Sequence, residues 1–279
     1  MKKLWIRIPV FLFLLFAISF VCFLPVVAFF PENFHPRKAA DNSELITDTK
    51  IELITNLAFF VAMISSVSIM VRGLEEKSLA SVKLNFDYRG LVIGFLGSSI
   101  LITLLAFLLW LYGFTTFTYV GFSHALSIGF LLHFLVSLSE EILFRAYLLN
   151  TLEEKLKTPW AILWSSLAFG AVHLANDHVT WVGILNIFLS GVLMGIVTAK
   201  SMSISSAIGL HWGWNFMQGP VMGFNVSGHL SPGLFSANST DNHLLSGGDF
   251  GAEGSILLAP ITIFACWLAS SQTRKKHAN

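Results

Sequence analysis

Long stretches without a charged side chain constrain this sequence more than any other feature. Between Arg89 and Arg145 the only ionisable side chains belong to two tyrosines, two histidines and an adjacent pair of glutamates. Over the whole chain 54% of residues are hydrophobic and only 12% are charged, about half the charge of a typical soluble protein. A helix needs about 20 apolar residues to cross a bilayer, and these stretches are long enough. The sequence therefore predicts an all-α, multi-pass integral membrane protein.

The apolar stretches predict a bundle of about eight transmembrane helices. We expect them at residues 5–30, 51–71, 90–113, 121–150, 159–176, 180–199, 203–224 and 255–271. The first is kept as an anchor helix, because its apolar run is longer than that of a usual signal peptide and no cleavage pattern follows it. The predicted parts of the chain are N-terminal helices (1–119), a core (120–224), and a C-terminal part (225–279). That last part combines a polar outer loop, the last helix and a basic tail. Its loop, 225–254, is a lid or a simple connector.

Lysine and arginine predict the orientation of the chain, because short cytoplasmic loops collect these residues. With the N-terminus inside, the cytoplasmic side holds Lys2, Lys3, Arg7, Arg72, Lys77, Lys83, Arg89, Arg145, Lys155, Lys157, Lys200, Arg274, Lys275 and Lys276. The predicted outer segments 114–120, 177–179 and 225–254 contain no lysine or arginine. Only the first outer loop, with Arg37, Lys38 and Lys50, departs from this rule. We therefore expect both termini in the cytoplasm and a location in the cell (plasma) membrane.

Charge and cysteine content exclude two classes of function. The net charge of +1 provides no basic patch for nucleic acid, so the lipid bilayer is the expected non-protein partner. Cys22 and Cys266 both fall in apolar spans, where a thiol behaves as a small hydrophobic group. They indicate neither a disulfide framework nor a zinc site.

The most informative polar residues lie at membrane depth, where an ionisable side chain is costly and points to function. Glu141 and Arg145 are four residues apart in the fourth span, so they face the same side of a helix and partly neutralise each other. Glu140 points about 100° away and lacks that partner. An isolated carboxylate of this kind is a candidate general base. The alternative is an interfacial cluster that simply ends the helix.

Two further spans contain polar residues within apolar surroundings. His173 follows Phe169 by four residues in the fifth span, and a lone histidine there is either catalytic or a hydrogen-bonded packing residue. His211 and Asn215 lie four apart in the seventh span and share a face. A neutral histidine and an asparagine on one face supply two donors for an oxyanion, or else an interhelical hydrogen-bond pair. Polar groups that converge inside a bilayer need water or substrate to satisfy them.

In this order, the patterns Glu140-Glu141-x-x-x-Arg145, Phe169-x-x-x-His173 and His211-x-x-x-Asn215 resemble the three motifs of the CPBP family. That family comprises type II CAAX prenyl proteases and bacteriocin-processing or Abi proteins. The resemblance covers about residues 120–220 and shows no departure at the motif positions. It implies an intramembrane endopeptidase that cleaves a membrane-associated or prenylated (CAAX-type) protein or peptide substrate.

The resemblance also implies roles for the motif residues. Glu140, helped by His173, would activate a water molecule, and His211 with Asn215 would stabilise the oxyanion. Glu141 and Arg145 would support the site without reacting. Two histidines and a glutamate would also suit zinc, but the His-Glu-x-x-His helix of zinc proteases is absent, so no cofactor is favoured.

Two alternatives are a non-catalytic immunity or scaffold protein and a small proton-coupled transporter. Counting along the predicted spans places Glu140 near the inner side of the bilayer and His173 near the outer side, so the two residues are expected at different depths.

Overall fold

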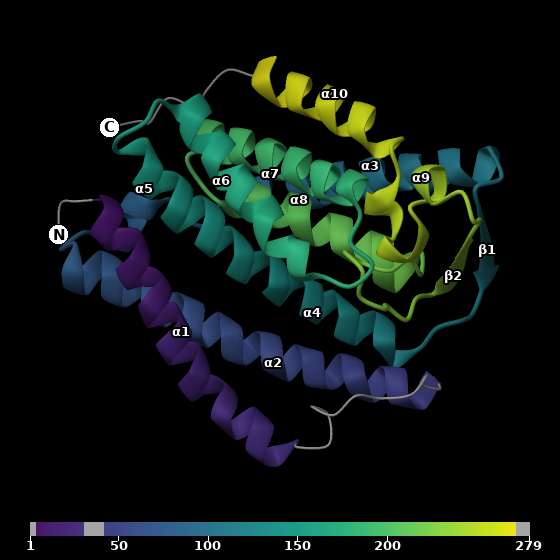
Figure 1. Cartoon of the computed structure of the whole chain (residues 1–279), viewed down its shortest axis with the longest axis horizontal. Helices are drawn as coiled ribbons and strands as arrows, with labels where there is room; N and C mark the ends of the chain where they lie inside the picture. Colours follow the sequence, from purple (N-terminus) through teal and green to yellow (C-terminus); the bar gives the residue numbers. More distant parts are fainter. Residues whose placement is uncertain (1–3, 31–41, 272–279) are drawn as a thin grey trace.

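The chain folds into a bundle of helices with a two-stranded sheet at one end (Figure 1). The computed structural model describes residues 4–30 and 42–271. The longer helices are α1 (Leu4–Phe29), α2 (Asn42–Ser68), α3 (Tyr88–Leu111), α4 (His124–Glu141), α6 (Thr158–Val172), α7 (Trp181–Ser201), α8 (Ser205–Phe216) and α10 (Leu258–Ser271). Helices dominate the described residues, so the predicted all-α class is confirmed.

Each of the eight predicted spans overlaps one of these helices, but not all of them are long enough to cross a bilayer alone. Five described helices have the required length and composition: Ile6–Phe29, Thr49–Leu74, Tyr88–Leu111, His124–Glu153 and Trp181–Ser201. The helices α6, α8 and α10 have 15, 12 and 14 residues. The protein is thus an integral membrane protein, while the count of eight spans stays a prediction.

Three helices continue into π-helical turns. These turns are Ile69–Leu74 after α2, Ile142–Leu149 after α4 and Met217–Val221 after α8. The short helix α5 (Asn150–Glu153) then completes the fourth segment. Single π turns inside α-helices are frequent at functional sites. The turn after α4 contains Arg145 of the first motif, and the turn after α8 begins two residues beyond Asn215.

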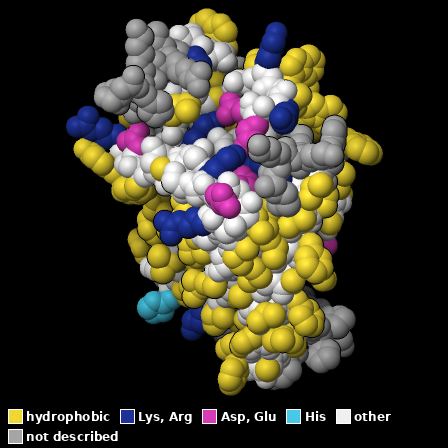
Figure 2. All heavy atoms as spheres, turned by 90° about the vertical axis from the view of Figure 1, so that its left-hand side faces the viewer, with side chains coloured by type: hydrophobic (Ala, Val, Ile, Leu, Met, Phe, Trp, Pro, Cys, Tyr) yellow, Lys and Arg dark blue, Asp and Glu magenta, His cyan; other side chains and the backbone are white. Residues whose placement is uncertain are grey.

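Successive long helices alternate in direction, so one end of the bundle collects the start of α1, the segment between α2 and α3, and the end of α10 (Figure 1). Seen from that end, lysines, arginines and acidic side chains gather on the surface, and apolar side chains cover the flanks (Figure 2). The cytoplasmic orientation of this end stays a prediction. The predicted positions Lys2, Lys3, Arg37, Lys38, Arg274, Lys275 and Lys276 lie outside the described residues.

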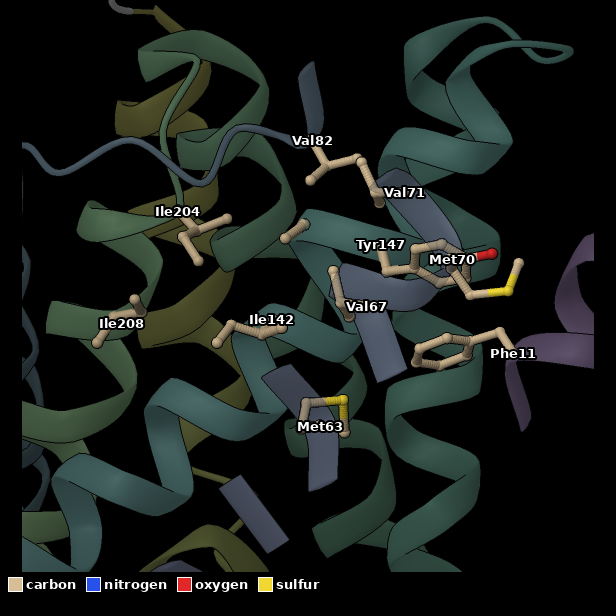
Figure 3. Packing of buried hydrophobic residues seen from close by; sticks show 11 residues of the cluster. Phe11, Met63, Val67, Met70, Val71, Val82, Ile142, Tyr147, Ile204 and Ile208 are labelled. Atoms are coloured by element: carbon tan, nitrogen blue, oxygen red, sulfur yellow. The ribbon is translucent and has the colours of Figure 1, made fainter. Parts of the chain in front are cut away.

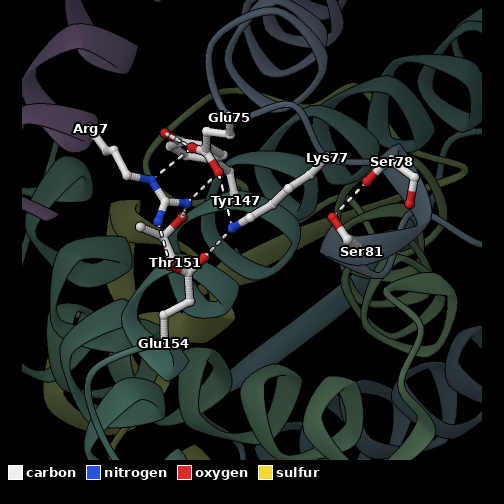
Figure 4. A network of polar contacts seen from close by, with 8 residues as sticks. All are labelled: Arg7, Glu75, Lys77, Ser78, Ser81, Tyr147, Thr151 and Glu154. Carbon is white, nitrogen blue, oxygen red and sulfur yellow. Dashed lines mark hydrogen bonds and ion pairs between the residues drawn. The ribbon is translucent and has the colours of Figure 1, made fainter. Parts of the chain in front are cut away.

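A buried ion-pair network ties α1 to the rest of the bundle at this charged end (Figure 4). Arg7 is only 3% exposed, and its Nε and Nη2 donate to the carboxylate of Glu75 at 2.8 and 2.5 Å. Its Nη1 donates to Glu154 at 2.5 Å, and Lys77 also pairs with Glu154 at 2.6 Å. The planar guanidinium matches two carboxylates at once, which a lysine at this place would not do.

The largest apolar cluster lies where α1, α2, the π-helical turns after α4 and the start of α8 meet (Figure 3). Within it Phe11 stacks on Tyr147 with ring centroids 4.1 Å apart. In lipid there is little water to exclude, so such a cluster stabilises the bundle mainly by van der Waals packing. On the outer face of α1, Phe13, Phe16 and Phe20 are more than 60% exposed, a surface suited to lipid chains.

Small residues bring α8 against α3. A Cβ atom added at Gly209 would lie 2.1 Å from the carbonyl oxygen of Leu91, and one at Gly213 would lie 2.3 Å from that of Phe95. Only glycine allows this approach, as at other close helix contacts in membranes. Because His211 lies between the two glycines, this contact fixes its position in the bundle.

The polar segment 225–257 covers the end of the bundle opposite the charged one, and we call it the polar cap (Figure 1). Its strand β2 (Phe235–Ser239) pairs antiparallel with β1 (Thr115–Tyr119), and Phe117 is opposite Ala237. A short helix, α9 (His243–Ser246), and 3-10 turns at Gly248–Phe250 and Ala252–Gly254 follow. Neither strand was predicted from the sequence, because β1 pairs with a partner far along the chain.

Side chains of the bundle bind the backbone of the polar cap. Asn186 on α7 donates from Nδ2 to the carbonyls of Glu253 and Ser255 at 2.7 and 2.8 Å. Asn176 donates to the carbonyl of Ser227 at 2.9 Å. These contacts attach the cap to α7 and to the end of α6, so the segment is packed structure rather than a loose connector.

Candidate active site

The structure brings the predicted reacting residues to one cavity of about 410 Å³. Glu140 comes from α4, His173 from the end of α6, and His211 and Asn215 from α8, and all four line it. Glu141 and Arg145 do not line it and lie behind it, each with a fully buried side chain. The six predicted residues therefore divide into a cavity set and a supporting pair.

The supporting pair is an ion pair inside the bundle. Arg145 Nη1 donates to Glu141 Oε1 at 2.8 Å, across one helical turn as predicted from the spacing. Its Nη2 donates to the carbonyl of Gly191 on α7 at 3.2 Å. The guanidinium also lies 4.4 Å from the ring centroid of Phe169 on α6, a cation–π distance. One arginine thus connects three helices of the site.

His211 lies between the two glutamates. Its Nδ1 is 3.0 Å from Glu141 Oε1, and its Nε2 is 3.9 Å from Glu140 Oε2. A carboxylate only accepts hydrogen bonds, so the proton of this contact belongs to Nδ1. In the neutral ring Nε2 is then an acceptor. A donor role for His211 toward an oxyanion therefore requires the protonated ring, and not the neutral one considered from the sequence.

His173 is held by its own helix. It directly follows Val172, the last residue of α6, and its Nδ1 lies 2.8 Å from the carbonyl oxygen of Phe169, which is an acceptor. The Nδ1 proton is used there, so Nε2 is left as the basic nitrogen. Because α6 is only 15 residues long, a histidine at its end still reaches the cavity that Glu140 lines. This removes the apparent difference in depth between the two residues.

Glu140 and Asn215 keep their polar atoms available. Within the described residues, Glu140 Oε2 has no hydrogen-bond partner although the atom is buried. The Glu140 side chain is 25% exposed, whereas that of Glu141 is fully buried. Asn215, one turn beyond His211, makes no side-chain hydrogen bond to a described residue and is 6% exposed. These are the groups that need water or substrate inside a bilayer.

Residues 122–217 match the family described as type II CAAX prenyl endopeptidase Rce1-like. The matched segment is Rce1-like. It contains all three motifs, so the family predicted from them is confirmed. No curated protein and no solved structure matches the chain. The family implies a protease, acting on a membrane-associated protein from within the bilayer.

Four further ionisable side chains line the same cavity and were not predicted: Glu52, His133, His229 and Glu253. Of these, His133 and Glu253 are buried. His133 precedes Glu140 by seven residues on α4, is 8% exposed, and its Nδ1 has no partner within the described residues. Two helical turns separate the pair, so helical spacing would have identified it. Glu253 comes from the polar cap, and no local pattern connects it to the motifs.

As they are placed in the structure, the described residues of the site do not form the ligand set of a metal centre. A catalytic zinc needs three protein ligands at roughly 2.0–2.3 Å from one point. Among the described residues, no group of three histidine, cysteine, aspartate or glutamate side chains is placed to hold an ion.

Proposed function

We propose that the protein is an intramembrane endopeptidase in which Glu140 activates water to hydrolyse a peptide bond of a membrane-associated or prenylated, CAAX-type substrate. One observation carries this proposal. Glu140 is a carboxylate without a hydrogen-bond partner for Oε2, on a cavity that His173, His211 and Asn215 also line. A general base, a second base and two donors are the groups that peptide hydrolysis requires.

In the proposed reaction, a water molecule enters the cavity between Glu140 and His173. Glu140 takes one proton from it, and the oxygen attacks the carbonyl carbon of the scissile bond. His173 orients this water through Nε2, the nitrogen that the Phe169 carbonyl leaves free. The bond to nitrogen then breaks, and Glu140 returns its proton to the leaving amine.

The tetrahedral intermediate carries a negative oxygen. Asn215 donates to that oxygen from its amide, and His211 donates from Nε2 when the ring is protonated. Glu141 accepts the Nδ1 proton of His211 and favours the charged ring electrostatically, and Arg145 holds Glu141 in place. Loss of one oxyanion donor typically costs about 10²–10³ in rate.

The test is cleavage of a peptide and membrane-protein library by purified protein in detergent. The library includes matched substrates with and without a farnesyl group on cysteine. Wild type is compared with Glu140→Gln and His173→Ala, and each is assayed with and without phenanthroline. The control is Glu76→Gln, an exposed glutamate of the segment between α2 and α3.

We expect wild type and the control to cleave, and both site variants to lose at least about 10²-fold in rate. Resistance to phenanthroline would favour the glutamate mechanism. Activity of Glu140→Gln equal to wild type would contradict the proposal and favour a scaffold or relay role for the polar cluster.

A further inference from the structure

The cavity contains a second carboxylate, Glu253, that the proposed reaction does not use. It belongs to the polar cap, in the 3-10 turn Ala252–Gly254, and is only 7% exposed. The hydrogen bond from Asn186 to its backbone carbonyl anchors the turn on α7. Glu253 is therefore held in place as part of the cavity wall, as are the lining residues that come from the helices.

One oxygen of Glu253 has a role in the fold. Oε2 accepts from the backbone N–H of Ser227 at 2.6 Å and from its hydroxyl at 2.9 Å. Ser227 has a φ of +51°, so these bonds hold a left-handed turn of the cap. A glutamine would accept both bonds through its amide oxygen. The fold therefore explains a side chain of this shape, but not its negative charge.

The charge of Glu253 has no cationic partner in the described part of the chain. No lysine, arginine or histidine nitrogen there lies within 4 Å of it. The described residues that line the cavity include Glu52, Glu140 and Glu253 but neither lysine nor arginine. Burial raises the pKa of Glu253, although Ser227 and the nearby His173 act in the opposite direction.

Burying a carboxylate without a counter-charge is strongly unfavourable. That cost is offset when a ligand brings a positive charge into the same cavity. The carboxylates of Glu140 and Glu253 differ in this respect, because Glu140 has His211 at 3.9 Å, whereas His173, which acts on Glu253 electrostatically, lies more than 4 Å from it. A cationic ligand therefore gains most beside Glu253.

We propose that Glu253 forms a subsite for a basic side chain, lysine or arginine, of the peptide substrate. The subsite lies on the side of the cavity where α6 ends, because Glu253 binds Ser227, whose carbonyl accepts from Asn176, three residues after His173. The inference rests on the proposed peptidase function and adds a specificity to it. Substrates with an acidic residue at this position are disfavoured by the same charge.

The test uses quenched fluorescent peptides that differ at one position, occupied by lysine, norleucine or glutamate. Norleucine keeps the length of lysine and removes the charge. The position is moved in turn through the residues on both sides of the scissile bond. Wild type, Glu253→Gln and the exposed control Glu76→Gln are compared by the ratio of kcat/KM for the lysine and norleucine peptides.

We expect wild type and Glu76→Gln to prefer lysine at least about tenfold at one position, and to cleave the glutamate peptide worst. In Glu253→Gln this ratio should fall to about one. The subsite is overturned if wild type shows no preference at any position. It is also overturned if Glu253→Gln lowers the rates for lysine and norleucine peptides equally, which is the result of a purely structural role.

A binding measurement separates failure of the subsite from failure of the peptidase proposal. The lysine and norleucine peptides are titrated by fluorescence anisotropy against Glu140→Gln and against Glu140→Gln with Glu253→Gln. If the lysine peptide binds more tightly than the norleucine peptide to Glu140→Gln but not to the double variant, the subsite is supported even if wild type cleaves nothing. Equal Kd values for both peptides in both variants contradict it.

Discussion

Replacing Arg145 by methionine should weaken the whole bundle, because this one side chain joins α4, α6 and α7. The variant loses the ion pair with Glu141, the hydrogen bond to Gly191 and the contact with the ring of Phe169. Breaking a buried ion pair by removing one partner costs about 3–5 kcal/mol. We expect a loss of about 3 kcal/mol in free energy of unfolding, near the lower limit, because His211 keeps its hydrogen bond to Glu141.

The measurement is unfolding by SDS in mixed micelles, followed by the fluorescence of the eight tryptophans. The control is Arg89→Met, because Arg89 is exposed and surface charges contribute little. In the double variant Glu141→Gln with Arg145→Met, no buried charge is left unpaired. Its loss should therefore be smaller than the sum of the two single losses by at least about 1 kcal/mol.

Two results would refute this reasoning. One is a loss in Arg145→Met no larger than that of Arg89→Met, which would mean that the buried guanidinium contributes no net stability. The other is strict additivity of the two single variants. Additivity would show that Glu141 and Arg145 are stabilised by separate surroundings and not by each other.

The remaining predictions also concern stability. Gly209→Ala should lower the free energy of unfolding by about 1–3 kcal/mol, because its Cβ meets the Leu91 carbonyl. The control Gly97→Ala has open space around the added Cβ and should change little in the same SDS titration. Because burial raises the pKa of Glu253, the stability linked to its protonated form is present at acid pH and lost as pH rises through that pKa. Glu253→Gln should therefore raise the Tm at pH 8 and lose this advantage toward about pH 4, near the usual carboxyl pKa. An unchanged Tm at pH 8 would contradict this cost of the buried carboxylate, and a lower Tm would show that the carboxylate stabilises the fold.

The helices were predictable because a bilayer imposes one strong local rule. An apolar run such as the one after Arg89 has to satisfy its backbone hydrogen bonds internally, so it becomes a helix whatever its neighbours are. The same rule does not decide whether a short helix crosses the membrane. The helix α6 shows this, since its 15 residues match the predicted position but not the expected length.

The candidate site was predictable where its residues share a helix. Glu141 and Arg145 face each other, and His211 and Asn215 share a face, because the helical repeat alone determines both arrangements. Contacts between helices were not accessible in this way. The hydrogen bond from His211 to Glu141, which decides the tautomer of the histidine, and the arrival of Glu253 from the polar cap both depend on the tertiary fold.

The π-helical turns after Glu141 determine how the residues before and after them are rotated relative to each other about the helix axis. A π turn closes its hydrogen bonds at i→i+5, so it holds an additional residue compared with an α turn. Upstream of it, Glu140 faces the cavity, and downstream Tyr147 packs on Phe11. A regular α-helix through these same residues would instead rotate one of these faces relative to the other by about 100°. The site could then be lost by rotation alone, with every motif residue still present.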